Sequence, residues 1–320
     1  MKLTLGCKVC LGLIIIFQFA SCTKEYESFT PNAINGSIED FFSIAQAPQT
    51  ELNIDTRIID HQVFPVGVQT YIGLTKESFL NHKNEIYLGA VQLKVQPIKG
   101  NSSHVLRCFS GLSTDEVFSP VLTIISIFKD STGHILNINS ASPPVIYTAS
   151  QDYDHLASYY QDLESKVERW FLSSNAAEYG NWNLSGTEEG NILSGYKFKL
   201  AKSGKFSIGI RKFKISGMKT TICLNLPTIF NRMNTLAFII DKKNTLIFKT
   251  NYSNEHDFCI DKGILENSEL LEVVIFADLG EGAIRYLRTQ RAPDRLNLFE
   301  YLPKPETYDY VFHDLRENLD

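Results

Sequence analysis

The stretch Tyr196-Lys197-Phe198-Lys199-Leu200 alternates apolar and polar side chains, and Phe206-Ser207-Ile208-Gly209-Ile210-Arg211 repeats this pattern a few residues later. An alternation with a period of two puts every second side chain on the same face of an extended chain, as in a half-buried β-strand. The stretch therefore predicts two consecutive β-strands.

The same signal extends in both directions from this stretch. Upstream it covers Glu51–Asp55 and the second half of 87–95, and the turn Lys129–Gly133 joins two apolar runs as a hairpin. Downstream the expected strands are 220–226, 235–240, 245–248 and 270–276, with a hairpin turn at Asp241–Asn244. Many short strands without a strand–helix rhythm predict a mainly β protein with two antiparallel β-sandwich-like domains.

One helix is expected between the two domains. Apolar residues at spacings of three and four mark one face of a helix over 154–171, and they are Leu156, Tyr160, Leu163, Val167 and Trp170. A polar stretch with three glycines follows, over 173–190. We therefore expect an N-terminal sandwich over 45–150, a helix and linker over 151–190, and a C-terminal β domain over 191–290.

The N-terminus has the pattern of an export signal. Lys2 and Lys8 precede an apolar segment, Val9–Phe17, that is too short to span a bilayer as a helix. Phe19-Ala20-Ser21-Cys22 then resembles the lipobox of bacterial lipoproteins, in which small residues precede the cysteine that receives the lipid. This predicts a signal peptide over 1–21, lipidation of Cys22 and a lipidated tether over 22–44. The alternative is an ordinary signal cut elsewhere, with Cys22 incidental.

Charge and hydropathy restrict the partners. The net charge is −5 and becomes more negative once Lys2 and Lys8 are removed, so the chain lacks the basic character of nucleic-acid-binding proteins. No later apolar stretch is long enough for a transmembrane helix. The expected membrane contact is therefore the lipid on Cys22.

The first residues after Cys22 carry a candidate sorting signal. Lys24, Glu25 and Glu27 resemble the short charged stretch that directs lipoproteins of Bacteroidota to the outer surface. They predict an outer-membrane protein that faces outward. The alternative is an ordinary polar tether.

Three of the six cysteines would remain beside Cys22 in the exported protein after Cys7 and Cys10 are lost with the signal. They are Cys108, Cys223 and Cys259, each flanked by apolar residues, which favours small core side chains. An exported chain also permits a disulfide, but the spacing does not reveal a pairing.

No motif in the sequence predicts catalysis. The histidines lack the spacing of a helical metal pair, and His256-Asp257 near Cys259 is more simply incidental than a metal site. A nucleophile elbow and a phosphate-binding loop are both missing from the sequence. Glu188-Glu189 and the pair Asp278 and Glu281 are neighbours in loops, and Glu281 between two glycines predicts a turn. We therefore expect no catalytic residue, cofactor or metal.

The segment 291–320 carries four basic and seven acidic side chains among its aromatic residues. Two interpretations remain open for this charged aromatic tail. Its aromatic side chains pack back on the body, or they form a docking segment for a partner.

Several segments resemble uncharacterised Bacteroidota-type surface lipoproteins that have a ZU5-like N-terminal β-sandwich, a linker with a tryptophan and a second β domain. The resemblance rests on Gln62-Val63-Phe64-Pro65, on Glu77-Ser78-Phe79-Leu80 and on Gly89–Val95. Trp182, or alternatively Trp170, resembles the linker tryptophan, and Lys202–Ile208 resembles the opening of the second domain. The resemblance implies an architecture and no activity.

These observations predict a lipid-anchored cell-envelope protein that binds a protein or a glycan. The alternative is an envelope hydrolase that acts on polysaccharide or peptidoglycan. An exposed aromatic platform on a shallow face would favour binding. A deep cleft with two facing carboxylates would favour hydrolysis.

Overall fold

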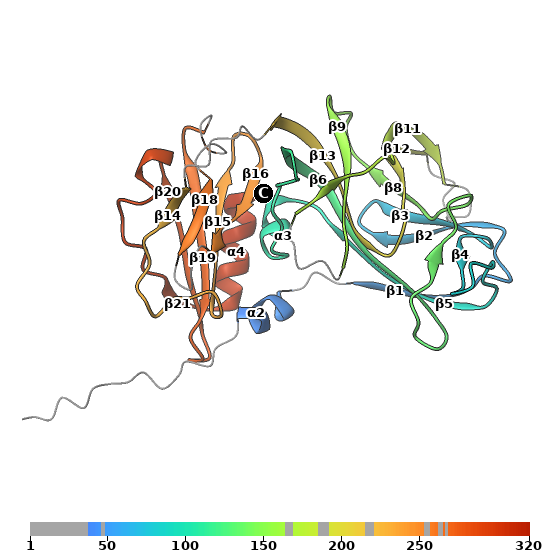
Figure 1. The fold of residues 1–320 in the computed structure, drawn as a ribbon, viewed down its shortest axis with the longest axis horizontal. Coiled ribbons are helices and arrows are strands. Elements are labelled where there is room, and N and C mark those ends of the chain that lie inside the picture. Colours follow the sequence, from blue (N-terminus) through green and yellow to red (C-terminus); the bar gives the residue numbers. More distant parts are fainter. Residues whose placement is uncertain are drawn as a thin grey trace, which may run out of the picture. The chain divides into compact units, whose positions relative to one another are not determined.

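The computed structural model describes residues 38–45, 49–163, 169–184, 192–214, 221–252, 257–261, 265 and 268–320. The fold is mainly β, and the paired strands in this part of the chain run antiparallel, which confirms the expected fold class (Figure 1). The expected signal peptide and most of the tether, with Cys22, Lys24, Glu25 and Glu27, lie outside the described residues.

Two sheets make a first β-sandwich. The six-stranded sheet has the order β1 (Thr50–Asp55), β5 (Ala90–Ile98), β6 (Glu116–Asp130), β13 (Gly204–Lys214), β9 (Leu156–Gln161) and β10 (Phe171–Leu172). The five-stranded sheet has the order β11 (Glu178–Asn183), β12 (Ile192–Lys199), β8 (Val145–Ala149), β3 (Thr70–Thr75) and β2 (His61–Gly67). A separate short pair joins β4 (Phe79–Leu80) to β7 (Asn137–Ile138).

The core of this sandwich lies where the alternating patterns of both sheets meet. Ile124 and Ile208 from the six-stranded sheet belong to one buried cluster with Ile72, Ile146 and Phe198 from the five-stranded sheet. The polar neighbours of these residues point away from the core, as a period of two requires. The predicted strand at 196–200 and the predicted strand at 206–211 are both confirmed.

The helix expected over 154–171 is wrong, because Leu156–Gln161 is the strand β9, paired with β13. Both faces of β9 are covered: Tyr160 packs against the first core, while Tyr159 lies in a second core. A strand that is apolar on both faces has no alternation to reveal it. Leu156 and Tyr160 therefore matched a helical spacing by coincidence, and Val167 lies outside the described residues.

The domain boundary expected near residue 190 is also wrong. Strands β12 and β13 both belong to the first sandwich, where β12 pairs with β8 and β13 lies between β6 and β9. The segment Lys202–Ile208, which resembled the opening of a second domain, leads into a central strand of the first. The chain thus returns to the first sandwich after residue 190, because β6 needs a partner on its other side.

The second β-sandwich is built from the later strands. Its five-stranded sheet has the order β16 (Leu246–Lys249), β15 (Thr235–Asp241), β19 (Leu271–Asp278), β20 (Ile284–Arg291) and β21 (Lys304–Glu306). Its three-stranded sheet has the order β14 (Thr221–Leu224), β18 (Phe258–Asp261) and β17 (Asn251–Tyr252). The hairpin predicted at Asp241–Asn244 is confirmed, since β15 and β16 pair directly across it.

Strands β15 and β19 are buried on both faces. Ile239 and Ile275 point into the core shared with the three-stranded sheet, whereas Phe238 and Phe276 point to the opposite side. Continuous apolar runs such as Leu271–Asp278 are typical of strands that are covered on both sides.

Three short helices are described, α2 (Ile38–Ile44), α3 (Asn101–Val105) and α4 (Tyr308–Leu319), with one 3₁₀ turn at Pro293–Arg295. Helices α2 and α4 cover the side of the sheet to which Phe276 points, and Figure 1 shows α4 running alongside β19. Phe41 is fully buried there, 5.4 Å from Phe276 between ring centroids. The tether therefore does not extend to residue 44, since Ile38, Phe41 and Phe42 have the spacing of an apolar helix face.

The segment 291–320 is an integral part of the second sandwich. Thr307 caps α4 by accepting a hydrogen bond from the Tyr310 backbone N–H, and Val311, Leu315 and Leu319 are buried on one face of the helix. Tyr301 is buried in the core between the two sheets. The interpretation that the aromatic side chains of this segment pack back on the body holds for Tyr301, Tyr308 and Phe312, whereas Phe299 and Tyr310 are exposed.

Candidate functional site

The outer face of the first sandwich's five-stranded sheet carries a group of aromatic and charged side chains. The strand register places Tyr71, Tyr147, Lys197 and Glu178 in one row across β3, β8, β12 and β11. Trp182 lies four residues after Glu178 on β11, and therefore on the same face. We call these five residues the aromatic face.

Glycines beneath two of the rings fix their orientation. A Cβ atom at residue 73 would lie 3.0 Å from Cε2 of Tyr147, and one at residue 180 would lie 3.1 Å from the Trp182 ring. The rings therefore lie close to the backbone, where any larger residue would displace them. The Trp182 indole N–H also donates to the Gly195 carbonyl at 3.0 Å.

Lys197 connects the charged and aromatic members of the face. Its Nζ lies 4.2 Å from the centroid of the Trp182 ring and 2.9 Å from Oε2 of Glu178. The hydrogen bond and the positive charge of Lys197 lower the pKa of Glu178, and burial raises the pKa of Tyr147. The face thus presents ring surfaces beside one lysine, one carboxylate and two phenols.

This arrangement suits a flat ligand that has both an apolar face and hydroxyl groups. Ring surfaces pack against C–H groups, and the amphipathic rims of Tyr and Trp provide hydrogen bonds next to that contact. The resemblance pointed to Trp182 as a linker tryptophan. It lies instead within β11, which pairs with β12 along its length.

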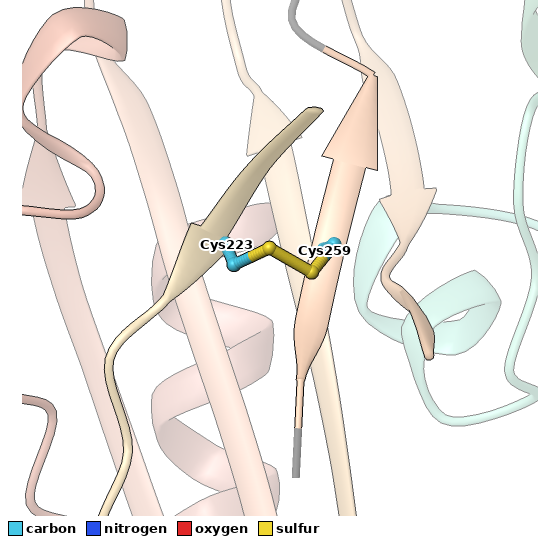
Figure 2. The surroundings of a disulfide bond; sticks show 2 residues. All are labelled: Cys223 and Cys259. Atoms are coloured by element: carbon cyan, nitrogen blue, oxygen red, sulfur yellow. A yellow bond between two sulfur atoms is a disulfide. The ribbon is translucent and has the colours of Figure 1, made fainter. Parts of the chain in front are cut away.

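Cys223 and Cys259 form a disulfide between directly opposed positions of β14 and β18 (Figure 2). The interpretation of both as plain core thiols is therefore wrong, and the alternative of a disulfide is right. The sequence left the pairing open because it depends on strand register. Cys259 is consequently not available as a thiolate metal ligand, and His256 lies outside the described residues.

The third cysteine, Cys108, lies on the turn after α3 with a positive φ of 53°. It lines a cavity of about 80 Å³ together with Trp170 and Lys205. Trp170, expected on a helix, is buried against Phe109 and Phe118.

His104 on α3 is fully buried at the start of a polar chain. Its Nδ1 lies 2.6 Å from the Gly100 carbonyl, and its Nε2 lies 3.1 Å from Oγ1 of Thr123, which in turn bonds Ser207. Burial lowers the pKa of His104 to about 4, although the Gly100 carbonyl and the charge of Asp320 oppose this shift. The ring is neutral at pH 7, and Nδ1–H donates to the Gly100 carbonyl, since a carbonyl oxygen can only accept.

The carboxylates singled out in the sequence have structural partners where they are described. Glu281 pairs with Arg285 at 2.7 Å, and Asp278 accepts from the Gly280 N–H, which makes the predicted turn. Glu188 and Glu189 lie outside the described residues. Within the described ranges, no group of three His, Cys, Asp or Glu side chains is placed to hold a metal ion.

Comparisons with models of known families, with curated proteins and with solved structures return no match to this chain. In the part of the chain that the structure describes, no helix is long and apolar enough to cross a membrane.

Proposed function

We propose that this protein is a lipid-anchored component of the cell envelope that binds a glycan through the aromatic face. The single observation that supports glycan binding is that the rings of Tyr147 and Trp182 pack directly against glycines. Ring orientations fixed in this way need little ordering when a ligand binds, which reduces the entropic cost of association.

The anchoring part of the proposal rests on the signal pattern at 1–21 and on Cys22. The Cys223–Cys259 disulfide supports it, because structural disulfides persist in oxidising compartments outside the cytoplasm. The charged residues Lys24, Glu25 and Glu27 and the resemblance to surface lipoproteins favour the outer membrane with the domains facing outward.

We favour binding over the alternative of an envelope hydrolase because of how the acidic residues that border one cavity are paired. Two acidic residues, Glu269 and Glu272, border one cavity of about 280 Å³. Glu269 pairs with Lys243, and Glu272 pairs with Arg288. Both carboxylates of this cavity are therefore engaged in ion pairs. The aromatic face, in contrast, includes rings whose placement no ion pair accounts for.

Affinity electrophoresis in native gels that contain dextran, xylan or polygalacturonate tests the glycan. We expect at least one polysaccharide to retard the full chain, and Trp182→Ala to weaken this binding about tenfold through the loss of ring contact. Tyr179→Ala is the matched control, because Tyr179 is an exposed aromatic residue of the same strand on the opposite face. Equal mobility in every gel, or equal loss in both variants, would overturn the proposal.

A further inference from the structure

A second cavity, of about 430 Å³, opens beside the end of strand β8. Its lining combines Lys99 and Asn101 with Ser150, Gln151 and Tyr153 from the segment after β8, and Thr245 from the turn between β15 and β16. The lining therefore contains hydroxyl, amide and phenol side chains and one lysine, beside apolar residues of β6 and β13. The volume is sufficient for a monosaccharide-sized ligand.

Lys99 differs from three other half-buried lysines of the first sandwich. Lys94, Lys197 and Lys202 each pair with a carboxylate, namely Glu51, Glu178 and Asp162. The Nζ of Lys99 instead donates to the neutral carbonyl of Val68 at 3.3 Å. Burial lowers the pKa of Lys99.

A partly buried cation without a counter-charge costs free energy, which an anionic ligand would recover. The chain has 36 acidic against 31 basic residues, so acidic partners for a lysine are abundant in the sequence. Lys99 nevertheless faces a cavity whose described lining contributes no carboxylate. The missing negative charge is therefore one that a ligand is suited to supply.

The remaining lining groups indicate what carries that charge. The Gln151 side chain is exposed, and Tyr153 presents a half-buried ring next to Ser150. Amide and hydroxyl groups complement sugar hydroxyls, and a ring complements the C–H face of a pyranose. Inorganic anions such as phosphate would use Lys99 and leave the ring unused.

The cavity also borders the sheet that carries the aromatic face. Ala149 on its rim pairs with Gly195, and the Gly195 carbonyl accepts the hydrogen bond from Trp182. We propose that this cavity binds the carboxylate of an acidic sugar, a uronic acid, with Lys99 as the counter-ion. This inference rests on the proposed function, for which it names the class of glycan.

Calorimetric titration of the full chain with galacturonate, galactose, acetate and phosphate tests the proposal. We expect galacturonate to bind more tightly than the other three, because it alone combines a carboxylate with a pyranose ring. Lys99→Met should weaken galacturonate binding tenfold or more, and Lys99→Arg should restore part of it. Lys76→Met is the matched control, since Lys76 is an exposed lysine outside the cavity.

Three outcomes would contradict the inference, and a fourth would separate it from the proposed function. Equal binding of galacturonate, acetate and phosphate would make this a general anion site. Galacturonate binding that survives Lys99→Met would place the ligand elsewhere. If a neutral polysaccharide binds through Trp182 while galacturonate does not bind, this inference fails and the proposed function stands. If galacturonate binding depends on Lys99 while Trp182→Ala has no effect on any glycan, the cavity is a uronic acid site and the aromatic face is not a binding surface.

Discussion

The guanidinium of Arg288 on β20 holds the carboxylate of Asp314 on α4 with two hydrogen bonds, from Nε at 2.7 Å and from Nη2 at 3.2 Å. The Tyr286 hydroxyl donates to the same carboxylate at 2.6 Å. Burial alone would raise the pKa of Asp314, but the bonds from Arg288 and Tyr286 hold it below its usual value. The Arg288–Asp314 pair therefore holds α4 against the five-stranded sheet of the second sandwich.

Removing the charge of Asp314 should loosen that helix. Asp314→Asn leaves the mostly buried Arg288 without its main partner, and we expect it to lower the free energy of unfolding by about 2 kcal/mol. Urea unfolding followed by circular dichroism measures this loss. Glu281→Gln, in the more exposed pair with Arg285, is the control and should cost less than about 0.5 kcal/mol. Equal losses would mean that the Arg288 pair contributes no more than a surface ion pair.

The disulfide should be a major contributor to stability. Cys223 and Cys259 are 36 residues apart in sequence, and in the chain-entropy model closing a loop of that size contributes about 4 kcal/mol. We expect a reductant, or Cys223→Ser with Cys259→Ser, to lower the urea midpoint. Cys108→Ser should remain as sensitive to reductant as the wild type. A reductant without effect on the wild-type midpoint would contradict the prediction.

His104 should make the fold sensitive to mild acid. Its pKa in the folded state is about 4, against about 6.5 for an exposed histidine, so the unfolded chain takes up the proton first. This contribution is complete above pH 6.5 and falls as the pH drops toward 4, with about 2 kcal/mol lost at pH 5. Urea unfolding at pH 7 and pH 5 measures it. His104→Gln should be less stable than the wild type at pH 7, yet its free energy of unfolding should fall less between pH 7 and pH 5. If the variant loses as much stability as the wild type over this range, the pH dependence comes from carboxylates and not from His104.

The proposed lipidation of Cys22 can be tested directly. Cells grown with labelled palmitate should incorporate label into the wild-type protein and into Cys108→Ala, but not into Cys22→Ala. The reason is that only the thiol after the signal segment would meet the lipid-transferring enzyme. Equal labelling of all three would remove the basis for a lipid anchor.

The orientation in the envelope is open to a separate test. Protease added to intact cells should degrade the wild-type protein, and replacing Lys24, Glu25 and Glu27 with alanine should protect it. Such a signal must be accessible near the lipid, which these positions allow. Wild-type protein that is digested only in broken cells would place the domains in the periplasm.

Alternation of side chains was sufficient to predict strands such as β1 and β5, because their side chains alternate between a more buried and a more exposed face. It failed for β9, since Tyr159 and Tyr160 both pack inward from opposite faces. A local pattern cannot show that a strand lies between two cores, because the second core comes from residues far along the chain.

The candidate site could not be predicted from the sequence, which does not show which aromatic side chains face outward. Tyr71, Tyr147 and Trp182 meet through pairings among β3, β8, β12 and β11 that bring distant segments together. The Cys223–Cys259 pairing could not be predicted for the same reason, because it also depends on strand register. Helix α2 was visible in the spacing of Ile38, Phe41 and Phe42, but its polar surroundings suggested a tether.

The rings of Phe41 on α2 and Phe312 on α4 lie 5.9 Å apart, although nearly the whole described chain separates them in sequence. The apolar side of the sheet around Phe276 is therefore closed by segments from opposite ends of that chain. Contacts of such long range form late in folding, because ordering the intervening chain must come first. With the export proposed above, a chain translocated in extended form would keep this surface open until the end of its transit, and chaperones beyond the membrane would be needed until both helices dock.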